Sequence, residues 1–520
     1  MLVLPSLSAT LVAQVFAAAL TVALTGALVS FGNSIRFKTR AAKQLKPIPG
    51  PKGRFLLGLV PELTKNLYRI YDFQADLLVK YGGRVHMPWN IFGANMVYIS
   101  DVKDVEHILV KNVNNYIKSE HFVLSVGEVF EKSLLAINHA NTPDGGAMYR
   151  LQRKVVTRVF TTANFKVHTE GIFHKYAMRL VDLINAQNGK CNMHQVASQY
   201  TMQTIFDIGC GVPLESFDKD LGLQFVKSMD FVFEMFLLRL VTQPYFKYFS
   251  WFMPSEYRYK REAKVMTDLI DSVLAKRLVE SEEALAGRND ILSLFIKKAR
   301  EESDGGLIDF ETLRSLVTAI VFGGRDTTTS TITYAFYNLA QHPEQQDKIF
   351  EELKTVDVSS MTFDDVKKLR YLDAFIYETL RLYPTTPSNF KHAANDDYLP
   401  DGTFIPAGTD VMYSSYYMGR NNAKLWGDDQ LEFRPERWLE MKTRPTACEF
   451  PIFQAGPRIC PGMNMALLEA KIFTAILVKE FHVKMQDGEQ VKDRPYLLGA
   501  TLVMEGGLPL QLTPRVAASN

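Results

Sequence analysis

The residue in this sequence best placed to do chemistry is a cysteine in a loop of turn-forming residues. Cys460 lies within Phe453-Gln454-Ala455-Gly456-Pro457-Arg458-Ile459-Cys460-Pro461-Gly462. An apolar helical pattern follows at once, from about Met463 to Phe481. Backbone N–H groups at a helix N-terminus favour a thiolate over a thiol, and a thiolate can act as a nucleophile or a metal ligand. A lone cysteine is more often a buried structural residue, so Cys460 by itself does not decide between these interpretations.

Three neighbours of this cysteine point to a bound ligand. Gly456 and Gly462 carry no Cβ and would let the backbone approach a flat molecule closely. Arg458 could bind an anionic group on that molecule. The loop therefore predicts a site for a flat, anionic ligand beside a thiolate.

A second candidate lies in a long apolar helical pattern that runs from Asp309, a predicted N-cap, to His342, where Pro343 stops it. This pattern contains Gly323-Gly324-Arg325-Asp326-Thr327-Thr328. Two glycines inside a helix cost about 1 kcal/mol each relative to alanine, so something should compensate for them. A local widening or kink there would free carbonyl groups and make room for a ligand over a metal. A packing kink in a buried helix is the simpler interpretation of the two glycines alone.

A third motif is Glu378-Thr379-Leu380-Arg381. Residues three apart share a helix face, so Glu378 and Arg381 can pair. An exposed pair of this kind contributes at most about 1 kcal/mol.

Taken together, these segments resemble the cytochrome P450 superfamily. The spacing F-x-x-G-x-R-x-C-x-G is similar to the haem-binding loop of that family. Gly324, Asp326 and Thr327 match its Gly-x-(Asp/Glu)-Thr group, in which the acid and the hydroxyl relay protons. Glu378 and Arg381 match its Glu-x-x-Arg motif, and Arg437, within Phe433-Arg434-Pro435-Glu436-Arg437-Trp438, matches the arginine that completes a buried triad.

The resemblance implies a mainly α fold with small β-sheets, in which haem b lies between a distal and a proximal helix and Cys460 binds the iron. It implies cofactor contacts at Phe453, Gly456, Arg458, Gly462, Tyr149, Arg153 and Lys391. Tyr149 replaces the usual tryptophan of the family, and Arg153 and Lys391 taken alone would also suit a solvated surface. The implied substrate pocket comprises Ala319, Phe322, Gly323, Ser388 and Leu502.

The implied activity is that of a monooxygenase that inserts one atom of O2 into a C–H bond of a lipophilic substrate, with Asp326 and Thr327 delivering protons. The motifs look most like the eukaryotic branch that contains fatty-acid ω-hydroxylases. Alternatives are a sterol, terpenoid or other secondary metabolite as substrate, an isomerase, or a haem-binding sensor. The resemblance also implies an NADPH-dependent flavoprotein reductase, with cytochrome b5 as a further candidate partner.

The N-terminus has the pattern of a membrane anchor. Residues 1–35 contain no charged side chain, and about 20 apolar residues suffice to span a bilayer. A basic and Pro-rich hinge follows at 36–53, and its positive charge favours the cytoplasmic side. We therefore expect an anchor in the endoplasmic reticulum membrane and a cytoplasmic catalytic domain at 54–520. A cleaved secretory signal is the alternative, weakened by the basic block that follows the apolar run.

Composition is that of a folded protein, and periodicity predicts a mainly helical one. Apolar residues make up 47% of the chain and the net charge is +2, which gives no reason to expect nucleic acid. Four cysteines in 520 residues do not form a disulfide framework. Periodicity predicts helices at Leu63–Tyr81 and over most of Val102–Leu353. It predicts strands within Val85–Ser100, Thr403–Ile405 and Val411–Ser414, and a closing hairpin at Thr501–Leu512 around Gly506-Gly507. The apolar stretch Phe231–Met253 fits either an entrance that dips into a membrane or ordinary core helices.

Overall fold

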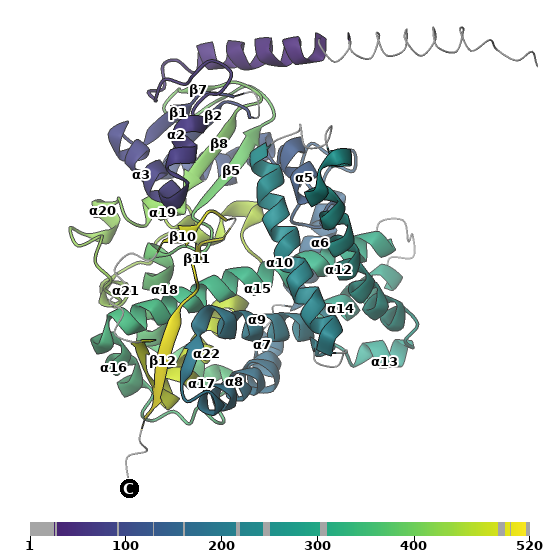
Figure 1. Cartoon of the computed structure of the whole chain (residues 1–520), viewed down its shortest axis with the longest axis vertical. Helices are drawn as coiled ribbons and strands as arrows, with labels where there is room; N and C mark the ends of the chain where they lie inside the picture. Colours follow the sequence, from purple (N-terminus) through teal and green to yellow (C-terminus); the bar gives the residue numbers. More distant parts are fainter. Residues whose placement is uncertain are drawn as a thin grey trace, which may run out of the picture.

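The computed structural model describes residues 25, 29–90, 93–127, 129–159, 162–214, 219–242, 250–301, 309–486, 495–499 and 501–515. Most of the predicted anchor at 1–35 lies outside these residues. Within the described part of the chain, no helix combines the length and the hydropathy needed to cross a membrane. Residues 29–44 form a helix at one end of the body, near β1 and β2 (Figure 1).

Helices dominate the body, as the sequence predicts. The longer ones are α3 (Ile70–Lys80), α6 (Ala147–Val159), α8 (His174–Ala186), α9 (Met193–Cys210), α10 (Lys219–Thr242), α12 (Pro254–Leu278), α14 (Ile291–Glu301), α15 (Phe310–Gln341), α16 (Pro343–Glu352), α18 (Arg370–Leu382) and α22 (Met463–Glu480). Shorter ones are α2 (Val60–Lys65), α4 (Val102–Glu106), α5 (Glu120–Val126), α7 (Thr162–His168), α13 (Glu282–Ala286), α17 (Phe363–Lys368), α19 (Ser415–Met418), α20 (Ala423–Trp426) and α21 (Glu436–Glu440). The predicted helix at Leu63–Tyr81 is interrupted between α2 and α3 by a 3-10 turn at Leu67–Arg69.

The helix α15 is the central element of the fold and runs through the middle of the body beside α9 (Figure 1). It begins as predicted, because the Asp309 side chain accepts a hydrogen bond from the Thr312 backbone N–H at 2.7 Å. It ends at His342, and Pro343 opens α16. Residues 310–341 remain α-helical throughout, so the local widening considered at Gly323-Gly324 is not found.

One mixed sheet packs at the end of the body near residues 29–44 (Figure 1). Its strand order is β1-β2-β8-β5-β3, formed by Arg84–Met87, Met96–Ile99, Asp410–Ser414, Ser388–Ala393 and Tyr116–Ile117. The pair β2–β8 is parallel, with Val97 opposite Val411, and the other pairs are antiparallel. The strands predicted within Val85–Ser100 and at Val411–Ser414 are therefore confirmed. The strand predicted at Thr403–Ile405 is present as β7 (Phe404–Ile405), which pairs with β6 (Asp397–Tyr398).

The predicted closing hairpin is wrong. The turn at Gly506-Gly507 exists, and both glycines have positive φ. However, β11 (Val503–Met504) pairs with β10 (Tyr496–Leu497), whereas β12 (Pro509–Pro514) pairs with β4 (Lys190–Asn192) and β9 (Phe481–Met485). Asn192 explains the change of partner, because its side-chain oxygen accepts the Leu508 N–H and directs the chain onto β4.

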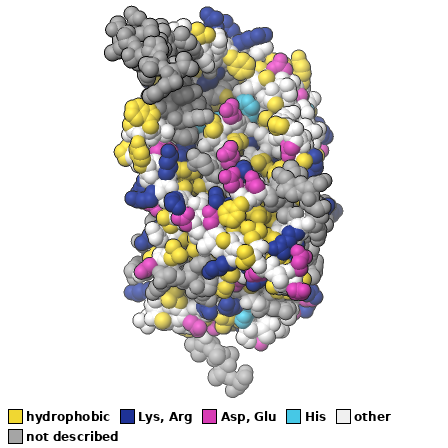
Figure 2. Space-filling model, turned by 90° about the vertical axis from the view of Figure 1, so that its right-hand side faces the viewer, with side chains coloured by type: hydrophobic (Ala, Val, Ile, Leu, Met, Phe, Trp, Pro, Cys, Tyr) yellow, Lys and Arg dark blue, Asp and Glu magenta, His cyan; other side chains and the backbone are white. Residues whose placement is uncertain are grey.

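Charges of both signs are interspersed with apolar side chains over much of the face seen in Figure 2. Such mixing fits the small net charge of the chain.

Candidate functional site

The loop that carries Cys460 is held by short-range hydrogen bonds. The Cys460 N–H donates to the Phe453 carbonyl oxygen at 2.8 Å, which closes the loop on itself. Gln454 adopts a positive φ of 59°, and its side-chain oxygen accepts a hydrogen bond from Lys391 Nζ at 3.0 Å. The thiol is consequently presented on the open side of the loop, where Cys460 is exposed to a cavity.

Two opposing effects act on the Cys460 thiol. Burial is the larger one and raises the pKa of the thiol above its ordinary value. The backbone N–H groups of Gly462 and Met463, at the start of α22, and the charge of Arg153 lower it. The predicted influence of the helix N-terminus is present, and a bound cation would complete the conversion to thiolate.

The cavity in front of Cys460 has a volume of about 310 Å³ and lies between the Cys460 loop and α15. Ala319, Gly323 and Thr327 line it from α15, and Phe453, Arg458 and Gly462 line it from the loop. Ser388, Phe322, Leu502 and Gly456 of the predicted set are not among the lining residues. Among the described residues, no group of three or more His, Cys, Asp or Glu side chains could hold a metal ion.

Glycine is present at positions 323 and 324 of α15 for two different structural reasons. A Cβ at Gly323 would meet nothing within 4 Å, because this glycine faces the cavity. A Cβ at Gly324 would lie 2.5 Å from the Ile205 side chain of α9, so only glycine permits this approach. Close helix packing and free space in the cavity thus replace the predicted widening as the explanation of Gly-Gly.

Positive charge gathers at one side of the cavity. Arg458 Nη2 donates to the Ile137 carbonyl oxygen at 2.9 Å, whereas its buried Nη1 has no hydrogen-bond partner among the described residues. Burial and the charge of Arg458 lower the pKa of Lys391 to about 7. Burial, Arg458 and Lys391 lower the pKa of Lys118 well below its ordinary value. The described residues that line the cavity include Lys118, Arg153 and Arg458 but no carboxylate, so this side is built to receive an anion.

Two residues of the predicted cofactor set make close contacts within the protein. The Tyr149 hydroxyl donates to the Pro457 carbonyl oxygen at 2.9 Å, and its ring lies 4.4 Å from the Arg458 guanidinium. Tyr149 therefore supports Arg458, and it also lines the cavity, where its contact with the cofactor stays a prediction. Gly456 has a φ of 63°, and a Cβ there would lie 2.1 Å from the Leu109 carbonyl oxygen. This glycine allows backbone packing outside the cavity, which corrects its predicted contact with a flat ligand.

Asp326 and Thr327 open onto different cavities. Thr327 lines the cavity at Cys460, and its hydroxyl donates to the Gly323 carbonyl oxygen at 2.6 Å. Asp326 lines a larger cavity of about 1190 Å³ between α9, α10 and α15, where it lies 3.2 Å from Arg325 Nη1. Arg325 also forms an ion pair with Asp230. Burial raises the pKa of Asp326 to about 6, while the charge of Arg325 opposes the shift.

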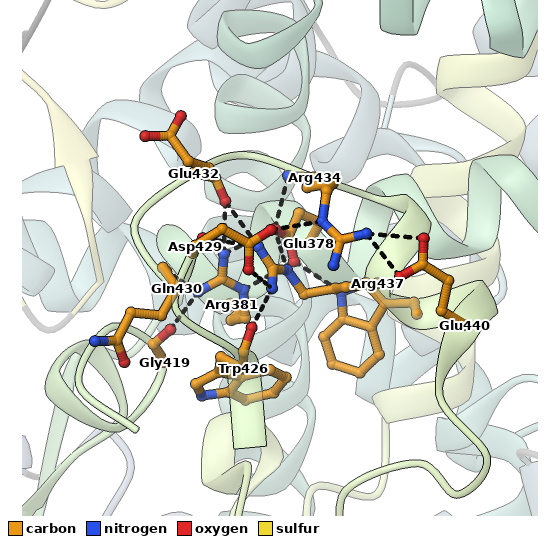
Figure 3. Close-up of polar contacts among 11 residues, drawn as sticks. Glu378, Arg381, Gly419, Trp426, Asp429, Gln430, Glu432, Arg434, Arg437 and Glu440 are labelled. Carbon is orange, nitrogen blue, oxygen red and sulfur yellow. Dashed lines mark hydrogen bonds and ion pairs between the residues drawn. The ribbon is translucent and has the colours of Figure 1, made fainter. Parts of the chain in front are cut away.

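The predicted triad of Glu378, Arg381 and Arg437 is assembled and fully buried (Figure 3). Arg381 binds Glu378 through two hydrogen bonds of 2.8 and 2.7 Å, and Arg437 Nε donates to Glu378 at 2.9 Å. Both arginines also donate to backbone carbonyl oxygens between Gly419 and Glu432. Buried charges require this degree of pairing, since each would otherwise lose its hydration uncompensated.

Aromatic rings connect the triad to the Cys460 loop. Trp438 Nε1 donates to Glu378 at 2.9 Å, and its ring lies 5.3 Å from that of Phe450. Phe450 also contacts Trp426, and Pro451 follows it directly at the start of the loop that leads to Cys460. The triad therefore acts on the loop through Trp438 and Phe450.

Phenylalanine rings from four parts of the chain form a cluster next to this section of α15. Phe322 of α15 contacts Phe130 and Phe233, with ring centroids 5.0 and 4.6 Å apart. Further ring pairs join Phe233 to Phe236, Phe236 to Phe122, and Phe122 to Phe390. We call these six residues the ring cluster. Phe322 thus contributes to the apolar surroundings, although it does not line the cavity itself.

Two predicted pocket residues lie elsewhere. The Ser388 hydroxyl donates to the Gln74 side chain at 2.7 Å. Leu502 is buried behind the cavity wall, where its N–H donates to the Thr385 carbonyl oxygen at 2.9 Å. Thr385 lines the cavity in its place.

Comparison with known proteins accounts for this arrangement. The family model for Cytochrome P450 matches residues 48–509. The chain belongs to the cytochrome P450 family. Among its relatives are Cytochrome P450 94C1 of Arabidopsis thaliana, 29% identical over 81% of this chain and 85% of that protein, and Cytochrome P450 704C1 of Pinus taeda, 31% identical over 87% and 90%. Cytochrome P450 704B1 of Arabidopsis thaliana is 30% identical over 90% and 95%.

Membership makes the chain a cytochrome P450 monooxygenase that uses haem b with a cysteine thiolate as axial ligand. The site fits this cofactor. Cys460 faces the cavity, Gly323 leaves space opposite it, and Arg458 has an unpaired buried N–H group at the edge where Lys118 and Arg153 also lie. A flat dianionic macrocycle needs these features: one soft ligand, open space opposite that ligand, and cations at one edge.

Sequence reasoning missed Lys118 and Thr328. Lys118 follows β3, and the Asn138 side chain holds it by bonds to its backbone N–H and carbonyl groups, 2.8 and 3.0 Å long. No motif marks this position. Thr328 lines the cavity with a buried hydroxyl that has no partner among the described residues. Its place beside Thr327 in the Gly-Gly-Arg-Asp-Thr-Thr motif was the available signal.

Proposed function

We propose that this cytochrome P450 hydroxylates a long-chain fatty acid at or near its terminal carbon. The observation that carries the proposal is the ring cluster, which packs around Phe322, the residue that precedes Gly323 on α15. Burial of an apolar chain end is favourable by about 25 cal/mol for each Å² removed from water. The similarity of the Gly-Gly-Arg-Asp-Thr-Thr and Cys460 motifs to the branch with fatty-acid ω-hydroxylases supports the same substrate class.

The residues of the chain divide the work at the cofactor. Bound haem b supplies the oxygen chemistry, and the thiolate ligand favours O–O cleavage. Arg458, Lys118 and Arg153 would hold the two propionates, because they are the basic residues that line the cavity in the described part of the chain. Lys391 supports this edge from behind through its bond to Gln454.

Proton delivery is assigned to Asp326 and Thr327. They are neighbours on α15, and each opens onto a different cavity. Asp326 would collect protons from the larger cavity, and a pKa of about 6 lets it carry one near neutral pH. The Thr327 hydroxyl would present a proton to the cavity that Cys460 also lines.

Electrons and location follow from the resemblance of the sequence. An NADPH-dependent flavoprotein reductase would supply electrons singly, with cytochrome b5 as an additional donor. Residues 1–35 would anchor the chain in the endoplasmic reticulum membrane with the catalytic domain on the cytoplasmic side. Alkaline extraction of membranes tests the anchor: the full chain should stay in the pellet, and a chain lacking residues 1–35 should be released to a greater extent.

Turnover of lauric and palmitic acid tests the substrate. Purified protein with a reductase and NADPH should give a substrate-binding spectral shift and a product hydroxylated near the chain end. A shift with sterols or terpenoids and none with fatty acids would contradict the proposal. Product formed without NADPH would indicate an isomerase, and haem binding without any turnover would indicate a sensor.

A further inference from the structure

The proximal helix α22 carries a carboxyl group that the proposed reaction does not use. Glu469 lies in the middle of α22 and is completely buried. Met465 and Ala466, about one turn earlier, line the cavity at Cys460. The partner of Glu469 is Thr204 of α9, which precedes Ile205, another lining residue. Glu469 and Thr204 therefore meet directly behind the cavity wall.

The two contacts of the Thr204 hydroxyl are both satisfied when Glu469 carries a proton. The Thr204 hydroxyl lies 3.1 Å from the Thr201 carbonyl oxygen and also contacts Glu469 Oε1. A hydroxyl has one proton to donate, and a backbone carbonyl oxygen can only accept. If Thr204 donates to Thr201, the bond to Glu469 forms only when Glu469 is the donor. An ionised Glu469 could only accept, so one of the two contacts would lack a proton.

The surroundings of Glu469 also disfavour a charge. Its Oε2 atom has no hydrogen-bond partner among the described residues, and neither has the nearby Tyr200 hydroxyl. A buried carboxylate without a compensating cation or full set of hydrogen bonds is strongly disfavoured. Burial raises the pKa of Glu469 to about 8, and the contact with Thr204 only partly offsets this shift. Burial and Glu469 together raise the pKa of the Tyr200 phenol well above its ordinary value.

Charged groups on the packed elements point elsewhere. Lys471 of α22 binds Asp373 of α18 at 3.0 Å, and Lys479 of α22 donates to the Leu353 carbonyl oxygen. On the facing helices α8 and α9, the Tyr176 hydroxyl donates to Asp207. None of these groups contributes to the pKa of Glu469.

We propose that Glu469 is an uncharged carboxylic acid in the folded protein and, as a hydrogen-bond donor to Thr204, positions α22 and the Cys460 loop against α9. The tie continues to the distal helix, because the hydroxyls of Thr201 and Thr329 lie 2.7 Å apart between α9 and α15. Glu469 is thus a positioning residue that fastens both helices of the cofactor site to α9 without adding negative charge behind the iron. This inference rests on membership of the family and not on the proposed substrate.

Infrared spectroscopy of the haem-loaded full chain tests the protonation state. The difference between wild type and Glu469→Gln should contain the C=O stretching band of a protonated carboxyl at pH 7. Absence of that band would overturn the proposal. The band should fade only above about pH 8, where Glu469 ionises.

The pH dependence of unfolding provides a second measure that needs no cofactor signal. The pKa of Glu469 is about 8 in the folded protein against an ordinary value of 4.5. Between these values the unfolded chain loses a proton that the folded chain keeps, so this group's contribution to stability is present below pH 4.5 and is lost as the pH rises toward 8. The unfolding temperature of wild type should therefore fall relative to that of Glu469→Gln across this window. Parallel curves would contradict the inference.

Three variants separate positioning from simple packing. Glu469→Gln keeps a neutral donor, whereas Glu469→Leu keeps the bulk without the donor. The thiolate-type Soret band should survive to a higher temperature in Glu469→Gln than in Glu469→Leu. Thr204→Val should lose the band at about the same temperature as Glu469→Leu. Reduction potentials of wild type and Glu469→Gln should agree at pH 7 and diverge above pH 8, with the wild type lower. Equal thermal survival of Gln and Leu, or a lower wild-type potential already at pH 7, would refute the role.

Discussion

The two sides of the cavity at Cys460 are held together by different forces. On the proximal side, Glu378, Arg381 and Arg437 are fully buried and bound by directional hydrogen bonds to side chains and backbone. On the distal side, the ring cluster joins α5, α10, α15 and β5 by apolar contacts, and most of its rings are only partly buried. Directional bonds specify one geometry, whereas apolar contacts specify little more than shape and volume. The proximal side therefore fixes the cofactor, and the distal side leaves room for different substrates.

Removal of the cysteine should have the largest effect. Cys460→Ala eliminates the only cysteine that lines the cavity among the described residues, so the thiolate-type Soret band and all turnover should be lost. The carbon monoxide difference spectrum of the reduced protein measures this directly. Cys448→Ala is the matched control, because Cys448 is buried nearby but lies outside the cavity, and it should keep the band. A thiolate-type band that persists in Cys460→Ala would refute the assignment.

Breaking the triad should come next. Arg381→Ala leaves Glu378 buried without its closest partner, and such changes cost about 3–5 kcal/mol of unfolding free energy. Chemical unfolding and the fraction of protein loaded with haem should both report the loss. Arg444→Ala removes a partly exposed arginine that pairs with Asp373, and it should change stability by about 0–1 kcal/mol. Similar losses of unfolding free energy in Arg381→Ala and Arg444→Ala would show that the buried triad contributes no more than an exposed ion pair.

Thr327→Ala tests proton delivery from the distal side of the cavity. The haem should bind normally, but less product and more peroxide should form per NADPH consumed, with a loss of product of up to about 100-fold, the low end for proton-transfer groups. Thr318→Ala is the control, since the Thr318 hydroxyl makes the same type of bond to the carbonyl group four residues earlier. Unchanged coupling in Thr327→Ala would argue against proton delivery by this hydroxyl.

The smallest effect is expected at the ring cluster. Phe322→Ala removes the ring that contacts both Phe130 and Phe233, so the distal space should enlarge while the cofactor spectrum stays the same. Binding titrations should show a several-fold gain for bulky sterols relative to palmitic acid, within the roughly 1–3 kcal/mol by which pocket volume discriminates ligands. Phe310→Ala, at the partly exposed start of the same helix, should leave selectivity unchanged. A lost Soret band in Phe322→Ala would mean that the two sides are not independent.

The proximal side was largely predictable, because its residues lie in short segments whose spacing reports their chemistry. Glu378 and Arg381 share one turn of α18, and Cys460 precedes α22 within one loop. The ends of α15 were predictable for the same reason, since Asp309 and Pro343 act locally on the backbone. Local periodicity also identified the strands at Val85–Ser100 and Val411–Ser414.

Contacts between distant segments were not predictable. The hairpin predicted at Gly506-Gly507 does not form, because β12 pairs with β4 and β9 and not with the preceding strand β11. Gly456 was predicted to contact the ligand, but a Cβ at this position would meet the Leu109 carbonyl oxygen. Lys118 reaches the cavity only because Asn138 holds its backbone, and no spacing in the sequence links these two residues.

By itself, the sequence determined the ligand loop, the buried ion-pair motif and the mainly helical class, because hydrogen-bonding and helical periodicity act over a few residues. The tertiary structure alone decided which cations border the cavity, that Asp326 and Thr327 face different cavities, and how six phenylalanines from separate segments meet. Those outcomes depend on which surfaces pack together, and side-chain packing is settled only when the whole chain has folded.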